Sequence, residues 1–338
     1  MSGDFLSKNL SISAWKTNIT MLNGSYYTDS SYCDIKIQAI SVLSIIISPV
    51  GMGLNAKVLW LLGICMHRNA FSVYIFNLAM ADFLFLCFQF VFSSFIVIYF
   101  LYSIFLEIPL FFYFWRIFSY LSGLSILSTI STERCLSVIW PIWYHCNRSR
   151  RTSAITCFVL WAMSLLLGLL DGIACGLLFN SFDIYWCVTS DVIISVWLIA
   201  LFVVLIGCNL TLLVRIFCGS HRIPVTRLYV TIAFTVLVFL IFGFPFGVYW
   251  LLYLWVGDFH YISHCDFFYD TQFLYCINSC INPIIYFLVG SIRHRMFRRK
   301  SLKLLLQRAM QDIPEEEECV DNNSLEHPEE LERVQSSS

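Results

Sequence analysis

Long apolar runs separated by short polar segments dominate this chain. Each run extends over about 20 residues or more, which as helix is enough to cross a bilayer core about 30 Å thick. Apolar and polar positions do not alternate along the runs, as they do in the strands of a membrane barrel. The pattern therefore predicts an all-α membrane protein with seven spans, at residues 37–66, 73–99, 109–139, 152–178, 188–217, 225–256 and 267–289.

The composition restricts the class of protein further. Of the 338 residues, 59% are hydrophobic and only 13% are charged, whereas a soluble domain carries about 25% charged residues. A net charge of -1 offers no basic surface to a nucleic acid. The histidines are scattered at loops and form no metal-binding or nucleophilic arrangement, so we expect no catalytic residue, no metal, no cofactor and no enzymatic activity.

The distribution of basic residues predicts how the chain is oriented in the membrane. Lys and Arg follow the first, third, fifth and seventh spans, and the loops after the second, fourth and sixth carry none. The positive-inside rule then places the N-terminus outside the cell and the C-terminus in the cytoplasm, which suits a multi-pass plasma-membrane protein. Glycosylation sequons at Asn9, Asn18 and Asn23 lie on the predicted outer side.

Four regions follow from this arrangement. We expect a glycosylated extracellular tail at 1–34 and the bundle of seven spans at 35–290. Basic residues among apolar ones at 291–308 predict an amphipathic helix that lies on the membrane lipids. The acidic segment 309–338 predicts a disordered cytoplasmic tail, whose terminal serines would recruit an arrestin if they were phosphorylated.

A few polar residues interrupt the apolar spans. Asp82 lies within the second span, Asn55 within the first, and Asn278, Ser279 and Asn282 within the inner half of the seventh. An ionisable group at mid-membrane costs at least about 2.5–3.5 kcal/mol, so its presence needs a reason. Two interpretations stay open: hydrogen bonds that hold helices together, and a cluster filled with water or ions that rearranges during a conformational change.

Two motifs give these spans a functional meaning. The third span ends in Thr132-Glu133-Arg134-Cys135, and the seventh ends in Asn282-Pro283-Ile284-Ile285-Tyr286, where Pro283 interrupts the helical hydrogen bonds. Together with Leu78-Ala79-Met80-Ala81-Asp82, they resemble in order and spacing the inner-half motifs of rhodopsin-like G-protein-coupled receptors over residues 35–305. The resemblance implies a bundle of seven transmembrane helices that binds an agonist and a heterotrimeric G protein. It also implies that Arg134 leaves a local partner, Glu133, for the C-terminal helix of Gα, and that Asp82 and its polar neighbours form a candidate sodium site.

Further motifs narrow the resemblance. The stretches at 131–138, 140–144, 218–220 and 244–247 resemble the Mas-related G-protein-coupled receptors, whose members have Glu-Arg-Cys where most receptors have Asp-Arg-Tyr. Within this family, the chain resembles a rodent member of the B subfamily, similar to the mast-cell receptor for basic secretagogues. The resemblance implies a receptor for basic peptides and amine drugs that signals through Gq, and also Gi, in mast-cell degranulation or in itch and pain sensing.

The chain also departs from most rhodopsin-like receptors, in ways that are typical of the Mas-related group. Gly243 stands where most of them have a Trp that switches during activation, and Pro109 stands where the usual bridging Cys would be.

Two other classes of membrane protein fit the sequence less well. A transporter or channel would show internal repeats and paired broken helices, which this sequence lacks. A decoy receptor that does not couple to a G protein would not need Arg134 or the motif at 282–286.

Four of the 14 cysteines are expected at the oxidising outer surface, namely Cys33, Cys175, Cys187 and Cys265. Four cysteines allow three pairings. Cys175 and Cys187 flank the short loop between the fourth and fifth spans, and this pairing resembles the bridge of the family. Cys33 and Cys265 would then tie the N-terminus to the last outer loop.

The outer side also carries seven acids between the second and seventh spans, opposed there by Arg116 alone. They are Glu107, Asp171, Asp183, Asp191, Asp258, Asp266 and Asp270. Most of them are expected to form a solvated acidic rim. Asp171 and Asp191 differ, because each lies four residues from its bridging cysteine and a disulfide would hold the two close together. By resemblance, this acidic pair receives the cationic group of the ligand.

Aromatic residues of the sixth span complete the predicted ligand site. Phe246 and Trp250 share a helix face at a spacing of four residues, and Trp255 follows. Helix packing or an interfacial aromatic belt would also account for them. The resemblance favours an apolar, cation–π wall opposite the acids, most strongly for the two tryptophans.

Overall fold

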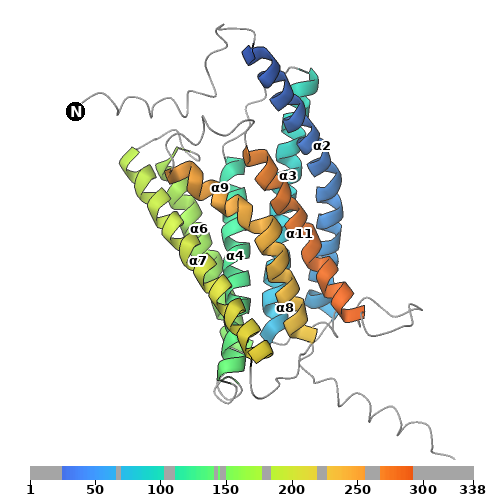
Figure 1. Ribbon diagram of the computed structural model, residues 1–338, viewed down its shortest axis with the longest axis vertical. Helices are drawn as coiled ribbons and strands as arrows, with labels where there is room; N and C mark the ends of the chain where they lie inside the picture. The colour runs from blue at the N-terminus through green and yellow to red at the C-terminus, as the bar shows by residue number, and fades with distance from the viewer. Residues whose placement is uncertain are drawn as a thin grey trace, which may run out of the picture.

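The computed structural model describes residues 25–65, 70–102, 111–140, 144, 150–176, 184–218, 227–255 and 267–291. They form a bundle of long helices (Figure 1). The elements are α2 (Ser25–Trp60) with the π-helical turn η2 (Leu61–Cys65), α3 (Ala70–Tyr102), α4 (Phe111–Ile139), α6 (Arg150–Ala174), α7 (Ile184–Cys218), α8 (Arg227–Val238), η3 (Phe239–Gly243), α9 (Phe244–Trp255) and α11 (Phe267–Ser291). Because α8, η3 and α9 follow one another without a break, these elements make up seven spans, as the sequence predicted.

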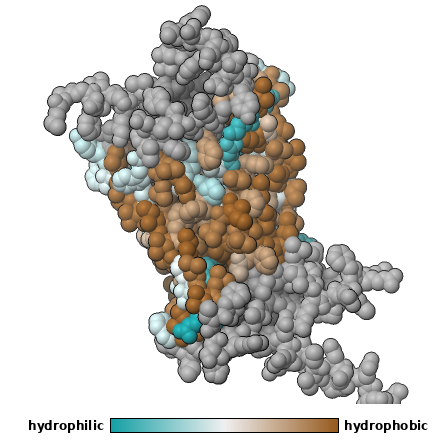
Figure 2. All heavy atoms as spheres, in the orientation of Figure 1, coloured by the Kyte–Doolittle hydropathy of each residue, from teal (hydrophilic) through white to brown (hydrophobic). Residues whose placement is uncertain are grey.

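The surface of the bundle is apolar over the middle of the helices (Figure 2). By length and composition, α2, α3, α6, α7 and the α8–α9 unit are each able to cross a membrane. Side chains of α6 and α7 face outwards, and Phe158 is 73% exposed and Val203 65% exposed. Such large apolar groups face lipid favourably, whereas in water they would be an aggregation hazard.

One of the more polar spans, α4, lies at the centre of the bundle. It packs against α3, α6, α7 and α8. A series of serines along this helix is buried, namely Ser119, Ser122, Ser125, Ser128 and Ser131. Several of these hydroxyls bond to carbonyls, such as the Ser128 hydroxyl, which donates to the carbonyl of Leu201 on α7 at 3.0 Å. A helix enclosed by other helices does not face lipid and so needs fewer apolar side chains, which explains why α4 has a lower hydropathy than the helices around it.

Some boundaries differ from the prediction. The first helix begins at Ser25, within the segment 1–34 predicted as a tail, because residues 25–36 include no Pro or Gly to stop it. In the sixth span, the backbone widens at η3, just before Pro245, and the N–H of Phe244 bonds to the carbonyl of Phe239. A proline removes one N–H and crowds the preceding turn, so a π turn accommodates it. The predicted helix 291–308, the acidic tail and the sequons at Asn9, Asn18 and Asn23 lie outside the described residues, apart from Ser291 at the end of α11.

Candidate functional site

A disulfide between Cys175 and Cys187 joins the end of α6 to the start of α7, with 4.7 Å between the two Cα atoms. This junction lies at the upper end of the bundle in Figure 1, here called the Asp191 end. Asp171 is in the last turn of α6, and its Oδ1 lies 3.5 Å from the Cys175 sulfur. The hydroxyl of Ser190, on α7, donates a hydrogen bond to the same oxygen at 3.3 Å. Sequence reasoning missed Ser190, because one more Ser in an apolar run carries no signal.

The second carboxylate lies on the other side of the disulfide. An oxygen of Asp191 is within 4.8 Å of both sulfurs, and its side chain is within hydrogen-bonding reach of Asp171. Asp171 is only 3% exposed, whereas Asp191 is half-buried. Asp191 is thus the accessible member of the pair. Since both sulfurs are taken up by the disulfide and are not thiolates, a cation at this place would meet the carboxylates alone.

The three predicted aromatic residues fall in different environments. Trp255 is 61% exposed, and its Nε1 donates to the hydroxyl of Ser195 at 3.1 Å, one helical turn from Asp191 on α7. Trp250 is partly buried against the main core. Phe246 is 3% exposed, and its ring centroid lies 4.9 Å from that of Tyr120. Of the three, Trp255 is therefore the residue beside the acids, and Phe246 belongs to the interior.

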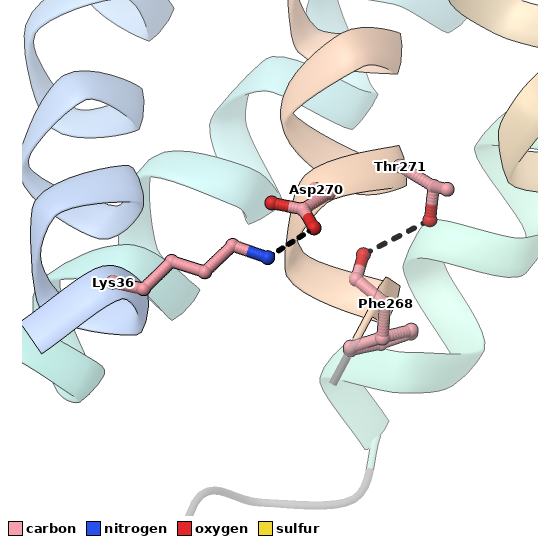
Figure 3. Close-up of polar contacts among 4 residues, drawn as sticks. All are labelled: Lys36, Phe268, Asp270 and Thr271. Carbon is pink, nitrogen blue, oxygen red and sulfur yellow. Dashed lines mark hydrogen bonds and ion pairs between the residues drawn. The ribbon is translucent and has the colours of Figure 1, made fainter. Parts of the chain in front are cut away.

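Asp270, which the sequence placed in a solvated acidic rim, forms an ion pair instead. Its Oδ2 lies 2.5 Å from Nζ of Lys36, so α11 is linked to α2 (Figure 3). Lys36 precedes the first span, so no local pattern predicts this pair. Cys33, one turn earlier on α2, is disulfide-bonded, and Cys265, its predicted partner, lies outside the described residues. The same is true of Glu107, Asp183, Asp258 and Asp266.

Arg116 is buried on α4, at the same end of the bundle. Its guanidinium carbon lies 4.3 Å from the centroid of the Phe92 ring on α3 and 5.0 Å from that of Phe268 on α11. Only 1% of the residue is exposed. The two rings form an aromatic sleeve around the guanidinium.

The polar residues predicted at mid-membrane come together between α2, α3 and α11. Nδ2 of Asn282 donates to Oδ2 of Asp82 at 2.7 Å, and Nδ2 of Asn55 donates to the carbonyl of Ser279 at 2.9 Å. These bonds support the interpretation that polar groups hold helices together. The cluster is able to accept a further hydrogen bond, because Oδ1 of Asn278 has no hydrogen-bond partner among the described residues.

Two tyrosines connect this cluster to the Asp191 end. The rings of Tyr120 and Tyr275 lie 4.8 Å apart, centroid to centroid. A Cβ added at Gly123 would lie 3.1 Å from the Tyr275 hydroxyl, and one added at Gly247 would lie 2.4 Å from the Tyr120 hydroxyl. The hydroxyls thus fill space that larger residues would need. Sequence reasoning missed both tyrosines, since aromatics are common in apolar spans.

The Glu-Arg pair lies at the opposite end of the bundle, here called the Arg134 end. The hydroxyl of Tyr74, on α3, donates to Oε1 of Glu133 at 3.0 Å. The guanidinium of Arg134 lies 4.7 Å from the centroid of the Phe71 ring. On α11, Pro283 and Tyr286 are buried. Tyr74 and Phe71 were not predicted, because their role depends on α3 packing against α4.

Comparisons with known proteins agree with these features. Residues 54–286 match the model of the seven-transmembrane receptors of the rhodopsin family. The chain is 71% identical to Mas-related G-protein coupled receptor member B2 of Mus musculus, over the full length of both chains. It is 53% identical to member X2 of Mus musculus, over 99% of this chain and 95% of that one. It is also 53% identical to member B4 of Rattus norvegicus, over 90% and 92%.

The similarity to member B2 of Mus musculus extends over the full chain and so over the whole bundle. The comparisons confirm the predicted family, which is a family of receptors and not of enzymes. Membership implies a multi-pass protein of the plasma membrane that has a ligand and a G protein as partners. The chain belongs to the rhodopsin-like G-protein-coupled receptors and, within them, to the Mas-related receptors.

Proposed function

We propose that this receptor binds cationic amphiphilic ligands, such as basic peptides and amine drugs, at the Asp171–Asp191 pair. It would then signal through Gq, with Gi as a second partner, in mast-cell degranulation or in itch and pain sensing. The observation that carries the proposal is the pair of carboxylates held around one disulfide, the inner one nearly buried. The cell type and the G proteins rest on the family resemblance alone.

Electrostatics supports a cation at this place. Two ionised carboxylates so close together repel each other, and a positive group between them relieves that repulsion. Each charge-assisted hydrogen bond contributes about 1.5–3 kcal/mol. Ser190 fixes the inner carboxylate, while the half-buried Asp191 is open to an arriving ligand. Trp255 adds an exposed aromatic face one turn away for a cation–π contact.

A route from the ligand to the G protein follows from the packing. Agonist binding shifts the equilibrium between two arrangements of the helices, because the agonist binds one of them better. Tyr120 and Tyr275 lie between the Asp191 end and the cluster around Asp82. In this structure Arg134 is 4% exposed. We infer that activation moves it from the Phe71 ring toward the C-terminal helix of Gα.

Intracellular calcium in cells that express the receptor tests the proposal. A polycationic secretagogue and a neutral analogue are applied to wild type, Asp171→Asn and Asp191→Asn, with surface expression measured in parallel. We expect only the cationic compound to act, and either substitution to raise its half-maximal concentration about tenfold or more. Asp270→Asn is the matched control, since this acid is already engaged by Lys36. A normal response in both Asp171→Asn and Asp191→Asn would refute the cation site.

The proposal also assigns each end of the bundle to one side of the membrane. The Asp191 end and the sugars at Asn9, Asn18 and Asn23 would be extracellular, and the Arg134 end, with the tail that would bind arrestin, cytoplasmic. Treatment of intact cells with an N-glycosidase should then increase the mobility of the receptor on a gel. Unchanged mobility would contradict the predicted glycosylation.

A further inference from the structure

Buried polar side chains gather around Arg116, on the side of α4 away from the acidic pair. Gln272 on α11 is 0% exposed, and neither Oε1 nor Nε2 has a hydrogen-bond partner within the described part of the chain. Gln89 on α3 is 3% exposed; its Nε2 donates to Ser93, and its Oε1 has no partner among the same residues. A buried amide without partners is costly, so such groups usually serve a ligand or another polar group.

Helix register places these side chains in one layer. On α11, Gln272 lies between Phe268, whose ring contacts Arg116, and Tyr275, whose ring lies 4.4 Å from that of Phe85 on α3. On α3, Gln89 lies between the same Phe85 and Phe92, which also contacts Arg116. Residues three or four apart share a helix face. By register, Gln89 and Gln272 therefore lie between the rings that contact Arg116, Phe92 and Phe268, and the Phe85–Tyr275 pair. We call Arg116 and the two amides the polar layer.

The layer lies close to the Asp191 end. Arg116 and Phe268 are within two turns of the first residues of α4 and α11. Phe268 is only partly buried. Figure 3 shows the carboxylate of Asp270 reaching toward Lys36 on α2, while Phe268 points away from that ion pair. Asp270 of α11 thus pairs with Lys36 of α2.

The two charged places lie on opposite sides of α4. Phe114 of α4 packs against Gly168 of α6, where an added Cβ would lie 3.0 Å from its ring, and Asp171 follows one turn later. Arg116 instead faces α3 and α11. A helix with its side chains is about 10–12 Å across, and an extended peptide covers about 3.3–3.6 Å per residue. An extended peptide of three or four residues is therefore about as long as α4 is wide.

The geometry points to a second subsite, in which Arg116, assisted by Gln272, binds a carboxylate of the same ligand whose cationic group lies at Asp171 and Asp191. The ligand class is an amphoteric peptide with a basic start and a free C-terminal carboxylate. A guanidinium binds a carboxylate through paired hydrogen bonds, and the buried Nε2 of Gln272 supplies a further donor. The inference rests on the proposed cation site for the other end of the peptide.

Two probe peptides test the subsite without any mutation. Both are pentapeptides with an arginine at the start and apolar residues after it, and they differ only in ending as a free acid or as an amide. On wild type, we expect the acid to evoke half-maximal calcium release at about one-tenth the concentration of the amide. A wild type that responds to neither peptide, or equally to both, overturns the proposal.

Two substitutions then test whether Arg116 and Gln272 cause the preference for the free acid. Arg116→Gln should make the two peptides equally potent by weakening the acid alone. Gln272→Glu should do the same, because it supplies a carboxylate to Arg116 from within the receptor. This variant keeps the size of the side chain and serves as the test if Arg116→Gln does not reach the cell surface. Lys36→Gln, the matched control, removes a basic residue already paired with Asp270 and should leave the acid preference intact. An acid preference that persists in both test variants overturns the subsite.

Asp191→Asn separates this inference from the proposed function. It should weaken both peptides by the same factor, so that their ratio stays as in wild type. If it weakened neither, the cation site would fail, while a ratio that depends on Arg116 would still support the carboxylate subsite.

Discussion

The two ends of the bundle are held together in different ways. At the Asp191 end, a disulfide joins α6 to α7 and an ion pair joins α2 to α11. At the Arg134 end, the contacts are non-covalent and include a hydrogen bond from Tyr74 to Glu133, one from Asn209 on α7 to Ser131, and the stacking of Arg134 on Phe71. Covalent and ionic links suit the end that would recognise a ligand, because a fixed site loses less entropy on binding. Weaker contacts suit the end that has to rearrange.

One residue type illustrates the contrast along a single helix. Arg116 and Arg134 both belong to α4, are both almost fully buried, and both lie over phenylalanine rings. Arg116 is enclosed by two rings and lies beside buried amides. Arg134 lies over Phe71 and next to Glu133, which accepts a hydrogen bond from the Tyr74 hydroxyl. The neighbouring residues, more than the arginine itself, thus decide how each side chain is enclosed.

Removing the arginine at the Arg134 end should have the largest effect. Arg134→Ala should abolish the calcium response at every agonist concentration while surface expression and binding of a labelled cationic ligand persist, since in the proposed function this residue acts only toward the G protein. Arg151→Ala, at an exposed arginine near the start of α6, is the matched comparison and should keep a calcium response. A normal response from Arg134→Ala would contradict the coupling role.

Removing the disulfide at the Asp191 end should have the next largest effect. Replacing Cys175 and Cys187 by Ser frees a loop whose closure stabilises the fold by about 3 kcal/mol. We expect a lower thermal denaturation midpoint of the detergent-solubilised receptor and a half-maximal agonist concentration raised about tenfold, because the two carboxylates separate. Ser substitution of Cys157, a buried cysteine of α6 that belongs to no disulfide, is the control. If the double variant kept wild-type agonist potency, the disulfide would not be what pairs the acids.

Breaking the ionic link at the same end should have the smallest effect. Lys36 and Asp270 are 28% and 24% exposed, so their pair contributes at most about 1 kcal/mol. Lys36→Gln should lower the denaturation midpoint slightly, and high salt should remove the difference from wild type. A loss as large as that of the disulfide variant would show that the rigidity of this end depends on the ion pair.

The sequence by itself determined the broad features of this protein. Long apolar runs can only be satisfied in a bilayer as helices, so the seven spans followed from hydropathy. The family followed from contiguous motifs such as 132–135 and 282–286, and the spacing of Asp171 and Asp191 from their cysteines placed both acids beside one bridge. Local spacing translates directly into helix geometry, which explains these successes.

Only the tertiary structure decided which faces meet. A spacing of four residues places Phe246 and Trp250 on one face, but it is the packing of α9 against α4 and α11 that buries Phe246 against Tyr120. The pairing of Lys36 with Asp270 joins residues 234 positions apart, and no pattern within either helix signals it. The polar layer around Arg116 is built from three separate helices. Periodicity fixes the face on which a side chain lies, whereas its partner depends on how whole helices pack against one another.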